Sequence, residues 1–124
     1  MTSSPAAGDA LAELREQLRT FARDRDWEPF HTPKNLAMAL AGEVGELVEI
    51  FQWLTPDEAA AVMASERADD VRDELADVLI YLVRLADVLD VDLAEVARRK
   101  VARNHDRFPH DAVRGRADHR PGAP

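Results

Sequence analysis

The chain of 124 residues is 46% hydrophobic and 32% charged, a length and composition that suit one domain with its own core. Its net charge of -8 argues against general affinity for DNA or RNA, which requires a basic face. The sequence contains no cysteine, so disulfide bonds and thiol chemistry are excluded.

The N-terminus lacks the basic and apolar pattern of a signal peptide, and no apolar run reaches the roughly 18 to 20 residues of a membrane span. We therefore expect a cytoplasmic protein with neither a membrane nor a nucleic-acid partner. Residues 1–8 are mostly small or helix-breaking, and the tail 110–124 is rich in Pro, Gly, Arg and Asp. We expect both segments to be disordered, on either side of a folded domain of residues 9–109.

An amphipathic helix is predicted at the start of this domain and ends near Arg25. Its apolar residues recur at intervals of three and four, at Leu11, Leu14, Leu18 and Phe21.

The following loop, residues 26–34, contains two prolines and no helical period. It also contains Trp27 and His31, and loops on rigid scaffolds often carry function. We therefore treat both as candidate ligand-binding residues. Alternatively, Trp27 covers the core and His31 stabilises the loop through a hydrogen bond. Asn35 is the expected N-cap of the next helix.

The second predicted helix, residues 36–53, carries Glu43 and Glu46 among apolar residues. Gly42 and Gly45 also lie inside it, and each costs about 1 kcal/mol relative to alanine in a helix. We therefore expect another backbone or a ligand to approach closely there.

The third predicted helix, residues 69–89, follows a short helical segment at residues 55–65 and carries Glu74 and Asp77. Its residues 78–83 are apolar almost all round, which is more surface than one small bundle covers. This pattern predicts burial against a second subunit.

The two acidic pairs share one spacing, because positions i and i+3 of a helix project from the same face. If the second and third helices pack together, Glu43, Glu46, Glu74 and Asp77 meet at a half-buried seam. Their repulsion then requires proton sharing, a basic partner or bound cations. Oxygen ligands suit Mg²⁺, or alternatively Mn²⁺. Either pair alone would more simply be a solvated helix face.

Two aromatic residues extend the acidic stripes along their helices. Trp53 follows Glu46 by two turns, and Tyr81 follows Asp77 by one turn. Both are candidates for contact with a ligand, although each is equally compatible with a core aromatic whose polar tip reaches the rim.

The fourth predicted helix spans residues 92–107. Lys100, Asn104 and Arg107 share one of its faces and form a basic stripe that suits phosphate oxygens. The alternative is ordinary basicity at a helix C-terminus, which complements the helix dipole.

In order and spacing, these motifs closely resemble the MazG-like all-α nucleotide pyrophosphohydrolases, nearest the dCTP pyrophosphatase branch. The resemblance covers residues 10 to 109 and rests on the loop 26–36, the segments 42–53 and 74–82, and the stretch from Lys100 to Pro109. It implies a four-helix-type bundle assembled as a homotetramer, a dimer of dimers. It also implies Mg²⁺-dependent conversion of a nucleoside triphosphate, such as dCTP or a modified dCTP, to the monophosphate and pyrophosphate.

The resemblance also assigns roles to residues by position. The implied metal ligands are Glu43, Glu46, Glu74 and Asp77. Independently, hydrolysis of a phosphoanhydride requires a positioned water, and we expect Glu46 or Glu43 to accept its proton. The implied substrate-binding residues are Trp27, His31, Trp53, Tyr81, Lys100, Asn104 and Arg107. One position departs from the dCTP branch, because Leu18 stands where that branch has a histidine near the base. The identity of the base therefore stays open.

Two other classes of protein compete with this interpretation. A non-catalytic helical interaction or regulatory module would use the acidic pairs only to bind partners or solvent. A ferritin-like di-iron bundle would require Glu-x-x-His ligand pairs, which the acidic motifs of this sequence do not contain.

Overall fold

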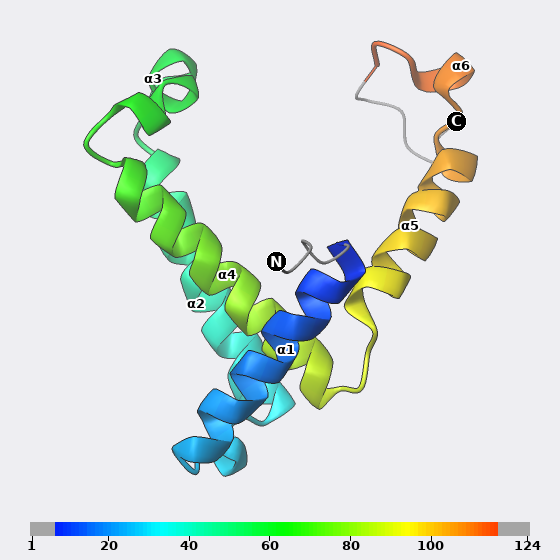
Figure 1. The fold of residues 1–124 in the computed structure, drawn as a ribbon. Helices are drawn as coiled ribbons and strands as arrows, with labels where there is room; N and C mark the ends of the chain where they lie inside the picture. The colour runs from blue at the N-terminus through cyan, green and yellow to red at the C-terminus, as the bar shows by residue number, and fades with distance from the viewer. Residues whose placement is uncertain (1–6, 117–124) are drawn as a thin grey trace, which may run out of the picture. The chain divides into compact units, whose positions relative to one another are not determined.

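The computed structural model describes residues 7–116, which form six α-helices and two short 3-10 helices with no strand among them. The all-α class expected from the sequence is therefore confirmed. The helices are α1 (Ala7–Asp24), α2 (Pro33–Phe51), α3 (Pro56–Ala60), α4 (Ala68–Val88), α5 (Leu93–Arg107) and α6 (His110–Val113). The 3-10 helices are η1 (Glu28–Phe30) and η2 (Val62–Ala64). The chain divides into two compact units, one ending at Val91 and the other beginning at Asp92 (Figure 1).

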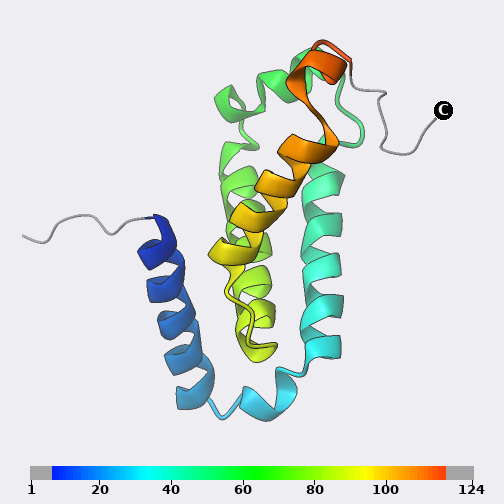
Figure 2. The ribbon, with the colours of Figure 1, turned by 90° about the vertical axis from the view of Figure 1, so that its right-hand side faces the viewer.

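In the first unit, α2 and α4 lie side by side and run in opposite directions (Figures 1 and 2). At one end of the pair, Arg84 of α4 bonds to His31, just before α2. At the other end, Ile50 of α2 packs with Val71 of α4. The middle of both helices, where the acidic pairs lie, is thereby brought together. α1 packs on α4, and no helix in the described part of the chain is long and apolar enough to cross a membrane.

The ends of α1 and α4 share one capping geometry, although neither carries the usual glycine. Asp26 and Asp90 adopt left-handed φ angles of 53° and 57°, which aspartate tolerates better than most residues. The amide of the next residue donates to the carbonyl five residues earlier, from Trp27 to Ala22 at 2.9 Å, as in a Schellman motif. This turn fixes where Trp27 leaves α1.

The N-terminal caps explain two further boundaries. Thr32, rather than the expected Asn35, caps α2: its hydroxyl accepts the Asn35 amide at 3.2 Å. The Asn35 side chain donates instead to the Phe30 carbonyl at 3.0 Å, which ties the loop to the helix. α3 begins with a full capping box between Thr55 and Glu58.

The buried core of the described residues is small. A cluster of Ile50, Val62 and Val71 closes the end of the α2–α4 pair nearest α3, and Leu36 is 2% exposed near the other end. The remaining buried apolar residues are Ala22, Val83 and Ala86. Much apolar surface on α2 and α4 therefore stays open in a single chain.

The apolar girdle expected at residues 78–83 is only partly exposed. Val83 is buried and Ile80 is half-buried, whereas Leu75, Leu79 and Leu82 form an exposed row on α4. On α2, Val44 and Val48 form a similar exposed pair. The exposed apolar surface of this region therefore lies on these two rows and not on Ile80.

The expected close approach at Gly42 and Gly45 is not found among residues 7–116. A Cβ atom added at either position would meet nothing within 4 Å in the described structure.

The second unit contains α5, which is capped by Asp92: its side chain accepts the Glu95 amide at 3.1 Å. Two boundaries differ from the sequence expectation. Helix α1 already includes Ala7 and Gly8, and the predicted tail contains the one-turn helix α6. Residues 1–6 and 117–124, for which we also expected disorder, lie outside the described residues.

Candidate active site

Three of the four predicted carboxylates meet between α2 and α4. Glu43, Glu46 and Glu74 each offer an oxygen atom, and these atoms lie within 4.8 Å of one another. The i, i+3 spacing places the two glutamates of α2 on adjacent parts of one face, and the antiparallel packing brings Glu74 opposite them. Glu43 and Glu74 are half-buried, whereas Glu46 is exposed.

Asp77 lies one turn further along α4 than Glu74 and is not part of this tightest group. Its negative charge nevertheless contributes to raising the pKa of Glu43, so its carboxylate acts on the same site. The site therefore contains three clustered carboxylates and a fourth within electrostatic reach.

The carboxylates of this cluster repel one another, and the pKa values of Glu43 and Glu74 are raised. Burial, followed by hydrogen bonding with Glu43 and Glu46 and by their charges, raises the pKa of Glu74 from 4.5 to about 7. A hydrogen bond with Glu74 lowers the pKa of Glu43, but burial and the charges of Glu46 and Asp77 outweigh it and leave that pKa raised. Repulsion is thus relieved in part by protonation.

Two oxygen atoms of this cluster suit a hard divalent cation. Glu43 Oε2 and Glu74 Oε2 are buried and have no hydrogen-bond partner within the described residues. Buried polar atoms normally have a hydrogen-bond partner or a bound ion, so these two oxygens are suited to binding a cation. With oxygen as the only donor type, the set fits Mg²⁺ or Mn²⁺.

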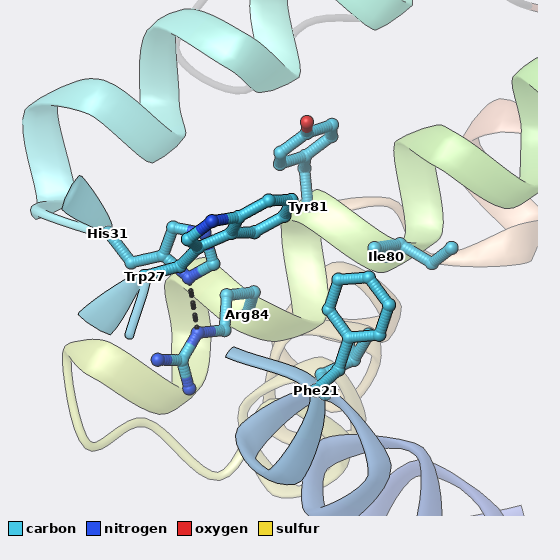
Figure 3. Close-up of a pocket in the computed structure, with 7 residues that line it drawn as sticks. Phe21, Trp27, His31, Ile80, Tyr81 and Arg84 are labelled. Atoms are coloured by element: carbon cyan, nitrogen blue, oxygen red, sulfur yellow. Dashed lines mark hydrogen bonds between the residues drawn. The ribbon is translucent and has the colours of Figure 1, made fainter. Parts of the chain in front are cut away.

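A pocket of about 250 Å³ lies against the C-terminal half of α4, beyond the carboxylates. Its walls are mostly apolar and aromatic (Figure 3). The residues that line it are Leu18, Phe21, Trp27, His31, Ile80, Tyr81 and Arg84. The pocket thus brings together three predicted substrate-binding residues, Trp27, His31 and Tyr81, and includes the departure at Leu18.

Aromatic side chains of the pocket pack against one another edge to face. The Trp27 ring meets the Phe21 ring edge-on, with centroids 5.6 Å apart, and meets the His31 ring at 6.4 Å. Such edge-to-face pairs hold a ring in place without covering both of its faces.

Two residues of this region, Arg84 and Asp87, were not identified from the sequence. Arg84 is only 8% exposed and donates from Nε to His31 Nδ1 at 3.0 Å, as the dashed line in Figure 3 marks. Its Nη1 donates to Asp87 Oδ2 at 3.2 Å, and Arg19 of α1 donates to both Asp87 oxygens. A signal was present, because Arg84 is the one charged residue in the apolar run 78–86 and Asp87 follows three residues later.

Trp53 does not line the pocket. It follows the C-terminus of α2 and is 87% exposed, whereas His31 precedes the N-terminus of the same helix. A helix of 19 residues is about 28 Å long at 1.5 Å per residue, so one chain cannot place both residues around one base.

The basic stripe lies in the second unit. Lys100, Asn104 and Arg107 share one face of α5, with Lys100 and Arg107 exposed and Asn104 half-buried. The Arg107 guanidinium lies 5.5 Å from the centre of the Phe108 ring.

The fold and site define an all-α protein with a carboxylate centre suited to a hard cation, next to an aromatic pocket. The chain belongs to the MazG-like family, whose model matches residues 39–117.

Curated relatives of known name support the same placement. The chain is 47% identical over 109 residues to the mouse (Mus musculus) dCTP pyrophosphatase 1, covering 86% of this chain and 64% of that protein. The chain therefore spans just under two thirds of the length of that relative. It is also 33% identical over 113 residues to the dATP/dGTP diphosphohydrolase of Cyanophage S-2L, covering 91% of this chain and 90% of the phage protein.

A solved structure is similar over nearly its whole length. The crystal structure of a pyrophosphatase from Archaeoglobus fulgidus is 40% identical in sequence and superimposes with a TM-score of 0.77, covering 88% of this chain and 98% of the archaeal chain.

Proposed function

We propose that this protein hydrolyses a nucleoside triphosphate to the monophosphate and pyrophosphate with a divalent cation. One observation carries the proposal: buried, unpartnered oxygens of Glu43 and Glu74 lie in a carboxylate cluster next to an aromatic pocket. The names of the mouse, phage and archaeal relatives, all pyrophosphatases or diphosphohydrolases, point to the same chemistry.

The roles of the carboxylates follow from what phosphoanhydride hydrolysis requires. Glu43, Glu46, Glu74 and Asp77 would hold Mg²⁺, which supplies charge neutralisation on the phosphates and polarises a water molecule when bound. Either Glu43 or Glu46 is assigned to accept the proton of that water. Lys100, Asn104 and Arg107 are assigned to the phosphates by the resemblance, and their basic character suits that role.

The pocket is assigned to the base. Trp27 and Tyr81 provide stacking surfaces, which contribute about 1 to 3 kcal/mol per base and tolerate any base. Stacking therefore does not set the preference, which we assign to the polar groups and to the width of the pocket. dCTP or a modified dCTP is the first candidate substrate because of the name of the mouse relative. All bases should be tested, because Leu18 departs from the dCTP branch and the phage relative is named for dATP and dGTP.

The open apolar rows of α2 and α4 support the proposal of a homo-oligomer, for which the resemblance implies a dimer of dimers. In such an assembly Trp53 would contact a nucleotide held by a second copy of the chain, because it cannot reach the pocket of its own chain.

The test is a panel of ribo- and deoxynucleoside triphosphates incubated with and without Mg²⁺, with pyrophosphate and phosphate measured separately. We expect pyrophosphate and monophosphate in equal amounts, only when the cation is present. Release of single phosphates, or no turnover of any nucleotide, would overturn the proposal and favour the non-catalytic interaction module.

A further inference from the structure

The pocket is lined in part by a buried arginine, Arg84. Arg84 is 8% exposed, and two of its three guanidinium nitrogens donate hydrogen bonds, Nε to His31 and Nη1 to Asp87. Asp87 is itself held by two bonds from Arg19, at 2.7 Å and 2.5 Å. Asp87 therefore holds the Arg84 guanidinium in place, and the Arg84 Nε–H points at the His31 imidazole.

This contact decides which nitrogen of His31 carries the proton. A guanidinium only donates hydrogen bonds, so Nδ1 of His31 must accept with its lone pair. In the neutral ring the single proton then lies on Nε2. A doubly protonated ring would turn an N–H toward the Arg84 N–H, which is unfavourable.

The surroundings keep the ring neutral. Burial and then the positive charge of Arg84 lower the pKa of His31 below its usual 6.5. The charged groups behind the ring are Arg84 and Asp87 of α4 and Arg19 of α1, while Trp27 contacts it from the η1 side and Tyr81 lines the same pocket. Asp87 is engaged by both arginines, and no carboxylate bonds to His31 in the described part of the chain.

We propose that Arg84 is a positioning residue that holds His31 as a neutral donor through Nε2–H, so that the pocket recognises a base by a hydrogen-bond acceptor. No described residue accepts a hydrogen bond from His31 Nε2, so this donor is available to a ligand in the pocket that His31 lines. A carbonyl oxygen or an unprotonated ring nitrogen of a base meets that need. An amino group at the same place would set donor against donor and is rejected.

The proposal rests on the proposed nucleotide substrate for its ligand, but its first test needs no ligand. In the full chain labelled with ¹⁵N-histidine, long-range ¹H–¹⁵N spectra near pH 7 distinguish the two ring nitrogens. The His31 signals are identified by their loss in His31→Gln, with His105→Gln as the control. We expect a pyridine-type Nδ1 and a pyrrole-type Nε2 in the wild type, and mixed tautomers in Arg84→Met. A protonated Nδ1 in the wild type would overturn the proposal.

The second test separates positioning from simple structural support. The amide nitrogen of Gln approximates His Nε2 and does not depend on Arg84 for its proton. We expect Arg84→Met to raise KM by about tenfold, the effect of one lost hydrogen bond, with kcat changed by less than about twofold. In the His31→Gln background the same change should raise KM by less than about twofold. An equal rise in both backgrounds would refute the positioning role.

Two further outcomes can be told apart, namely a variant that does not fold and a wild type that hydrolyses no nucleotide. If Arg84→Met does not fold, Arg84→Lys keeps the charge beside Asp87 but removes the guanidinium Nε–H, and the same KM comparison then decides. If the wild type shows the expected tautomer but hydrolyses no nucleotide, the proposed function fails and the acceptor-recognition claim fails with it.

Discussion

Loss of the Asp87 carboxylate should destabilise the protein more than any other single charge neutralisation in the first unit. Its side chain is 7% exposed and lies between Arg84, 10% exposed, and Arg19, 46% exposed. In Asp87→Asn both guanidiniums lose their counter-charge, and Arg84 is left buried. Removing one partner of a buried ion pair costs about 3 to 5 kcal/mol, and we take about 3 kcal/mol because Arg19 is open to water.

This magnitude is large enough to measure in a small domain. For 124 residues, an unfolding entropy of about 2.1 cal/mol/K per residue converts 1 kcal/mol into about 4 °C of Tm. Asp87→Asn is therefore expected to lower Tm by about 12 °C. Arg19→Met, which leaves the Arg84–Asp87 pair intact, is the matched control and should cost about 1 kcal/mol or less.

The assay is urea unfolding at fixed protein concentration, supported by thermal melts. Neighbouring charges also hold the pKa of Asp87 low, chiefly through the Arg19 hydrogen bond. A depressed folded pKa gives stability that is present above the unfolded value and is lost as pH falls through the folded one. The difference in unfolding free energy between the wild type and Asp87→Asn should therefore become smaller in acid. Equal costs for the two variants, or a gap that does not change with pH, would refute the reasoning.

Three other predictions follow from single features. The raised pKa of Glu74 means that the folded, metal-free protein binds more protons than the unfolded chain between pH 4.5 and about 7. Its free energy of unfolding should therefore fall as pH rises through that window, and Glu74→Gln should flatten the fall, as urea titrations would show. Thr55→Ala removes one half of the α3 capping box and should cost about 1 kcal/mol in thermal unfolding without changing KM. Leu79→Glu places a charge on the exposed row of α4, at a residue 41% exposed, and should reduce the sedimentation mass; an unchanged mass would exclude that row from the interface.

The helices could be predicted from the sequence because their apolar periods and caps are local signals. The meeting of the acidic pairs could also be predicted, since Glu43, Glu46 and Glu74 each lie on the apolar face of a helix that has to pack. The start of α2 was predicted three residues late, because Thr32 takes the capping role and Pro33 suits the first helical turn.

Other features depend on tertiary contacts that no local pattern contains. Trp53 and Trp27 look alike in the sequence, and only the packing of α1 on α4 places Trp27 in the pocket and leaves Trp53 outside it. The same packing brings Arg19 to Asp87 over 68 residues of sequence. Likewise, residues 78–83 of α4 are apolar almost all round, so the sequence pattern could not tell which of them face the pocket and which stay exposed.

The central claim is that the carboxylates between α2 and α4 form a divalent-cation site, and direct binding of Mn²⁺ tests it without any substrate. The electron paramagnetic resonance signal of free aqueous Mn²⁺ can be followed as the ion is titrated into wild type, Glu43→Gln and Glu74→Gln, with the exposed Glu28→Gln as the control. We predict that the wild type and Glu28→Gln deplete the free ion, and that both site variants lose at least about tenfold in affinity. Equal depletion by all four proteins would contradict the assignment.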